Sequence, residues 1–93
     1  MVITLMQVQL SIPASHSLKE KRMVVKSVKD RIRHRFNVSI SEIGDHEQWN
    51  SSVLGIACIG TDSKYVDTVL NDVIRLIDQA PGAHIIDYYQ ERL

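Results

Sequence analysis

Eight basic side chains lie between residues 18 and 36, against only two acidic ones, so this stretch carries a net charge of +6. Because the whole chain is formally neutral, the remaining residues carry −6. Ammonium and guanidinium groups that gather on one element create a local positive potential, and this potential attracts polyanions. The sequence therefore predicts an anion-binding surface on a molecule that has no overall charge.

Most of these cations share a helical spacing. Four of them recur at i, i+4, i+7 and i+11, and a fifth lies close to the same line, so on a helix they form one stripe beside the apolar stripe. We predict that this basic stripe binds nucleic acid; it consists of Lys19, Arg22, Lys26, Lys29 and Arg33. Asp30 is the only acid in the second half of the segment, so few intrahelical ion pairs neutralise the stripe. The competing interpretation is a solvated helix face whose aliphatic stems cover the edge of the core.

A second candidate site lies where this helix is expected to begin. Ser15, His16, Lys19 and Lys21 are close in sequence to the free amides of the first turn, which favour a phosphate or carboxylate. Lys21 falls within the apolar arc of the helix, outside the basic stripe. The alternative is therefore that Lys21 extends its ammonium group outward from the edge of the packed interface.

The other reactive side chains form no catalytic or metal-binding pattern. The four histidines show neither HxH nor HExxH spacing, so we predict no metal site and no cofactor. Cys58 has no basic neighbours and lies in an apolar segment, which predicts an inert core thiol. Trp49 lies in a polar loop, where it either anchors a partner or folds back over a sheet edge.

Two helices are predicted to position these groups. Ser17 and Glu20 have the spacing of a capping box, so the first helix begins at residue 18, and its apolar positions continue to residue 36. In that box the Glu20 carboxylate is expected to reach back to the amide of Ser17. The second helix covers residues 63–79, where apolar residues recur at i, i+3, i+4, i+7, i+8 and i+11.

Four strands are predicted around the helices, at residues 1–10, 37–43, 51–60 and 84–89. The resulting order β-α-β-β-α-β is that of the ferredoxin-like α+β sandwich, in which both helices cover one face of a four-stranded antiparallel sheet. Residues 1–93 are expected to form a single domain. The two alternating sets of the first and third strands both contain apolar residues, so the second sheet face is expected to be covered by another copy of the chain.

The composition restricts where the protein works. An apolar fraction of 44% with 24% charged residues is ordinary for a globular protein. The apolar runs are far shorter than the roughly 20 residues of a membrane span, and no export signal precedes the first strand. We therefore expect a cytoplasmic protein without membrane contact, and the single cysteine agrees with that compartment.

The chain resembles the YlxP-like family, a group of small bacterial proteins of unknown function. The resemblance is carried by SLKEKR at residues 17–22, by RFNVS at residues 35–39 together with Glu42, and by residues 49–59 ending in LGIACI. It implies a ferredoxin-like fold. Genes of the family are often found near those of translation-initiation and ribosome-maturation factors, so it also implies a bacterial protein with a tie to RNA or the ribosome.

These observations predict a non-catalytic module that contacts structured or ribosomal RNA through the basic stripe, with a role in translation or ribosome maturation. The first and third strands contain no aromatic residue for base stacking, so we expect neither base specificity nor specific binding to DNA. The alternative is a dimeric structural or regulatory protein that binds an acidic protein or a small anionic ligand. A phosphate-ester or acyl-phosphate hydrolase ranks last, because residues 11–17 lack the glycine-rich loop and arginine that this chemistry needs.

Overall fold

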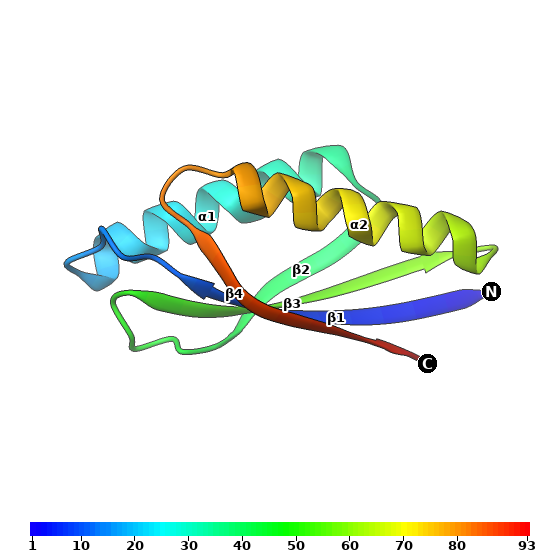
Figure 1. Cartoon of the computed structure of the whole chain (residues 1–93), viewed down its shortest axis with the longest axis horizontal. Coiled ribbons are helices and arrows are strands. Elements are labelled where there is room, and N and C mark those ends of the chain that lie inside the picture. Colours follow the sequence, from blue (N-terminus) through cyan, green and yellow to red (C-terminus); the bar gives the residue numbers. More distant parts are fainter.

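Two helices pack on one face of a four-stranded antiparallel sheet in the computed structural model, which describes residues 1–93 (Figure 1). The elements follow in the order β1 (Val2–Ser11), α1 (Leu18–Arg35), β2 (Val38–Gly44), β3 (Ser51–Gly60), α2 (Ser63–Gln79) and β4 (His84–Arg92). The strands are ordered β2-β3-β1-β4 across the sheet. This confirms the predicted ferredoxin-like arrangement.

A side chain caps the start of each helix, and for α1 it is Ser17, as the sequence predicted. The Ser17 hydroxyl accepts a hydrogen bond from the Glu20 amide at 3.1 Å, and the Asp62 carboxylate accepts one from the Tyr65 amide at 2.9 Å. One detail of the capping box was wrong. The Glu20 carboxylate accepts from the amide of His16 at 2.6 Å instead of from that of Ser17, because the extended Ser17 carries the preceding residue back beside the first turn.

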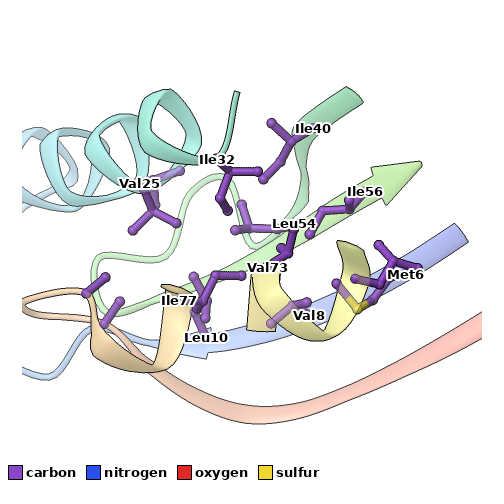
Figure 2. Packing of buried hydrophobic residues seen from close by; sticks show 14 of the residues in the cluster. Met6, Val8, Leu10, Val25, Ile32, Ile40, Leu54, Ile56, Val73 and Ile77 are labelled. Carbon is purple, nitrogen blue, oxygen red and sulfur yellow. The ribbon is translucent and has the colours of Figure 1, made fainter. Parts of the chain in front are cut away.

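The core lies between the helices and the sheet. Val25 and Ile32 of α1 and Val73 and Ile77 of α2 pack onto alternate residues of the two central strands, as Figure 2 shows. The side chains that β1 and β3 contribute to this layer are Met6, Val8, Leu10, Leu54, Ile56 and Cys58. α1 packs chiefly over β2, whereas α2 packs over β3, β1 and β4. The basic helix therefore lies above one edge of the sheet.

The last strand is longer than predicted. Beyond Tyr89 it continues through Gln90, Glu91 and Arg92, and Arg92 pairs with Thr4 of β1. Backbone pairing holds this segment, while most of its side chains are exposed at the sheet edge, so it lacks the apolar alternation that marks a strand in a sequence.

Candidate nucleic-acid interface

The basic stripe lies on the flank of α1 that faces away from α2, along the edge of the molecule formed by α1 and β2. It takes this position because Val25, Val28 and Ile32 turn the adjacent side of the helix into the core. Four of the five cations of the stripe are exposed, and Lys29 is half-buried. The stripe is therefore open to a large anionic partner over most of the length of α1.

Not all five cations are equally free. Lys19, Arg22 and Lys29 form no ion pair, whereas the Lys26 ammonium lies 2.6 Å from a carboxylate oxygen of Asp30. The hydrogen bond from Lys26 lowers the pKa of Asp30 below its usual value, and the nearby positive charges act in the same direction. The charge of the stripe is therefore partly compensated near Asp30 and uncompensated at the other three residues.

Arg33, at the end of the stripe, links α1 to the sheet. Its guanidinium donates a hydrogen bond to the backbone oxygen of Ile40 at 2.9 Å and lies 3.9 Å from Asp30. A guanidinium has five N–H donors, so this bond leaves donors free for phosphate oxygens. Arg33 thus fixes its end of the stripe against β2.

Three further basic side chains gather on the other flank of α1, and the sequence analysis missed them. Arg31, His34 and Arg35 line a shallow crevice of about 390 Å³ together with Leu76 and Gln79 of α2. Counting along one line of the helix could not find this group, because its other wall comes from an element more than 40 residues later. Both flanks of the second half of α1 therefore present cations.

Lys21 occupies a different environment from the other lysines, since its side chain is completely buried. Its ammonium donates to a carboxylate oxygen of Glu42 on β2 at 3.0 Å and to the backbone oxygens of Asp45 at 2.7 Å and His46 at 3.3 Å. The same Glu42 oxygen accepts a 2.6 Å hydrogen bond from the hydroxyl of Ser52. Lys21 and Glu42 thus join α1 to β2 and to the loop that follows it.

This arrangement corrects the prediction of an anion site at the start of α1. Lys21 points inward to its own carboxylate partner, so it neither binds a solvent anion nor extends outward from the interface edge. The Ser15 hydroxyl is also engaged, because it donates to the backbone oxygen of Ser17 at 3.0 Å, and the amide of His16 binds Glu20. Of the two predicted lysines, Lys19 alone keeps its ammonium group free of ion pairs, and it belongs to the basic stripe.

The buried pair predicts a pH dependence of stability. Burial by itself raises the pKa of Glu42, but the hydrogen bonds from Ser52 and Lys21 outweigh it, so the pKa lies below the ordinary 4.5. A carboxyl group whose folded-state pKa is lowered stabilises the fold above its unfolded-state pKa, and this contribution is lost as the pH falls through the folded-state value. We expect the difference in unfolding free energy between wild type and Glu42→Gln to be largest near pH 7 and to shrink below about pH 4.5. Urea unfolding at several pH values measures it, and a pH-independent difference would contradict the assignment.

The other residues considered in the sequence analysis form no common site. Cys58 is buried in the core layer, and desolvation raises the pKa of its thiol. Trp49 is 58% exposed in the loop between β2 and β3, so its indole is not buried against the sheet. No three histidine, cysteine or acidic side chains come close enough together to hold a metal ion. Neither helix combines the length and apolar character that crossing a membrane requires.

The fold and the charged helix define a ferredoxin-like α+β domain with a basic edge. The similar solved structures include a de novo designed protein with a ferredoxin fold, which is 11% identical and has a TM-score of 0.53 over 100% of this chain and 84% of that chain. They also include a C-terminal segment of the alpha subunit of aIF2 from Pyrococcus abyssi, which is 14% identical and has a TM-score of 0.53 over 99% of this chain and 51% of that chain. At these identities the likeness shows the fold alone.

Sequence comparison identifies the family. The model described as "Protein of unknown function (DUF503)" matches residues 3–90. The "Uncharacterized protein YlxP" of Bacillus subtilis (strain 168) is 42% identical over 65 residues, which cover 70% of this chain and 71% of that protein. The chain therefore belongs to the DUF503 family, and the resemblance to YlxP-like proteins is confirmed.

Proposed function

We propose that this protein is a non-catalytic binding module that contacts structured RNA through the basic stripe of α1. The observation that carries the proposal is the line of exposed cations that lack internal partners, with Lys19, Arg22 and Lys29 free of ion pairs. Unpaired Lys and Arg side chains on one helix flank are the groups that neutralise a phosphate backbone. The setting that we propose is translation or ribosome maturation in the cytoplasm, because of the gene neighbourhood noted above for YlxP-like proteins.

Binding is expected to follow phosphate positions and shape, with little dependence on base identity. Proteins that read single-stranded RNA on a sheet of this kind stack bases on aromatic residues of the central strands. β1 and β3 contain none, and the basic stripe lies on α1. The same cations could also bind an acidic protein. This is the alternative partner that we propose if RNA does not bind.

A charge-reversal variant tests this proposal. Changing Lys19, Arg22 and Lys29 together to Glu is expected to weaken binding to structured ribosomal RNA by roughly two orders of magnitude at low salt, because phosphate contacts are replaced by repulsion. These three side chains make no ion pair, so the fold should remain intact, and circular dichroism checks this. The measurement is a binding titration at low salt.

A matched control separates local contact from overall charge. The same reduction in net charge is placed around α2 by exposed substitutions, namely Thr61→Glu, Lys64→Glu, Asn71→Asp and Arg75→Glu. This control is expected to retain most of the wild-type affinity. Equal loss in both variants would show a general charge effect, and no binding by the wild type at low salt would replace RNA with the acidic protein partner.

A further inference from the structure

No helix covers the sheet face opposite α1 and α2 (Figure 1). Leu5, Ile43, Ile59 and Tyr89 are between 38% and 59% exposed, and they come from all four strands. Arg92 is the only lysine or arginine in the strands, and it lies on the helix side, where it binds Asp67 of α2. The acids Asp87 and Glu91 of β4 lie on the open face, and no lysine or arginine does, so this face repels nucleic acid.

The face has a hollow half and a raised half. Small residues of β2 and β3 form the hollow half, which is the floor of a groove of about 350 Å³; they are Ser39, Ser41, Gly55 and Ala57. The side chain of Ile43 lies against Gly55 and bounds this floor. Larger residues of β1 and β4 form the raised half beside it; they are Leu5, Gln7, Tyr89 and Glu91. The hydroxyl of Tyr89 donates to the side-chain oxygen of Gln7, which holds the ring in place beside β1.

Strand register sets small and large residues in common rows across the sheet. One row contains Ser41, Gly55, Gln7 and Tyr89 in that order. The next such row contains Ser39, Ala57, Leu5 and Glu91. In both rows the two residues at the β2 side are small and the two at the β4 side are large. If a second copy of the row is laid over the first in the opposite direction, large residues therefore face small ones.

We propose that a second copy of this chain covers the face, related by a two-fold axis that runs parallel to the strands within the interface. Such an axis reverses the strand order and keeps each row in place, so β4 of one copy lies over β2 of the other. Tyr89 then lies over Ser41, and Leu5 lies over Ala57. The raised half of each copy fills the groove of its partner, which is the self-complementarity that a two-fold interface requires.

Area and charge agree with this occupant. With about 4.8 Å between strands and about 3.4 Å per residue, a face of four strands of 7 to 10 residues covers about 600 Å². Two such faces bury about 1,200 Å², which exceeds the roughly 1,000 Å² expected of a specific interface. The two-fold axis also sets Glu91 opposite the hydroxyl of Ser39. An axis perpendicular to the strands would instead lay β4 over β4 and β2 over β2, which leaves both grooves empty. If it passed beside Glu91, it would also bring the two Glu91 carboxylates together.

A lysine in the groove tests the interface. Ala57→Lys puts a charged chain on a surface that is open to water in the monomer and dry in the dimer. We expect light scattering across the micromolar range to give twice the 10.6 kDa chain mass for the wild type and 10.6 kDa for the variant. Asn71→Lys on α2 adds the same charge at an exposed position outside the interface and is expected to remain dimeric. A monomeric wild type, or a dimeric Ala57→Lys with native circular dichroism, would overturn the proposal.

Cross-linking tests the direction of the axis independently of that variant. Ser39→Cys and Glu91→Cys are prepared separately, mixed, and treated with a short bis-maleimide; Cys58 is buried and faces the helices. The proposed axis predicts cross-links between the two variants and none within either variant alone. Self-cross-linking of Glu91→Cys would show the perpendicular axis and overturn this arrangement, and a dimer with neither cross-link would place the interface elsewhere. The proposal does not depend on RNA binding, because the basic stripe lies on the other layer.

Discussion

Replacing Glu42 with alanine is expected to lower the free energy of unfolding by about 3–5 kcal/mol. The substitution leaves the completely buried ammonium group of Lys21 without its counter-charge, with only two backbone oxygens as partners. A buried charge that loses its partner is among the most costly single changes in a protein, and domains of this kind are stable by only about 5–15 kcal/mol in total. Urea denaturation at pH 7 measures the loss.

Two companion variants separate the charge from the packing. Lys21→Met is expected to destabilise less than Glu42→Ala, because Glu42 keeps its bond from Ser52 and its side chain is 15% exposed. The double variant Lys21→Met/Glu42→Leu is expected to recover much of the stability lost in Glu42→Ala, since both charges are then absent. If the loss of unfolding free energy in the double variant equalled the sum of the losses in the two single variants, the two charges would not interact favourably in the fold.

RNA binding, if it follows the proposed contacts, is expected to weaken steeply with salt. The logarithm of the binding constant falls with the logarithm of the salt concentration with a slope of about −0.7 to −0.9 per neutralised phosphate. Between 50 and 200 mM salt this gives a loss of roughly 20- to 40-fold for three contacts and roughly 130- to 500-fold for five. The slope therefore shows whether Lys26 and Arg33, which have internal partners, join the three unpaired cations of the stripe.

Single substitutions show which residues contribute to the salt dependence of binding. Lys29→Ala is expected to flatten it by roughly one unit, because one phosphate contact is lost. Lys64→Ala provides the matched control, since Lys64 is an exposed lysine on α2 that likewise forms no ion pair. Equal flattening in both variants would mean that RNA has no preferred position on the surface, which would exclude the stripe as the binding site.

The fold was predictable because local pattern and tertiary packing agree over most of the chain. The bounds of α2 and of β3 match the expected residues, because their apolar residues repeat with one clear period or form one buried run. The end of β4 was missed for the opposite reason. Gln90 and Glu91 are held by backbone pairing at an edge, and edge pairing leaves no apolar signal in the side chains.

The surroundings of Lys21 were harder to predict than the fold. Its position in the apolar arc of α1 was visible in the sequence, but its partner Glu42 lies 21 residues further along the chain. Only the packing of α1 over β2 brings the two together, and helical periodicity carries no information about that neighbour. A lysine at a core position, followed later by a glutamate on the inward side of a strand, is the signal that could have suggested an internal pair.

The separation of charge in this molecule has a consequence for how it meets any charged object. The basic stripe lines the edge formed by α1 and β2, whereas Asp78 of α2 and Asp87 and Glu91 of β4 lie toward the other edge, and the net charge is zero. In a uniform electric field, a neutral molecule with separated charges experiences no net force, but it does experience a torque that orients it. At distance, then, a polyanion chiefly turns the molecule so that α1 leads, and attraction becomes strong only once the helix is nearer than the acidic edge. The charge pattern thus controls the angle of approach before it adds to the strength of binding.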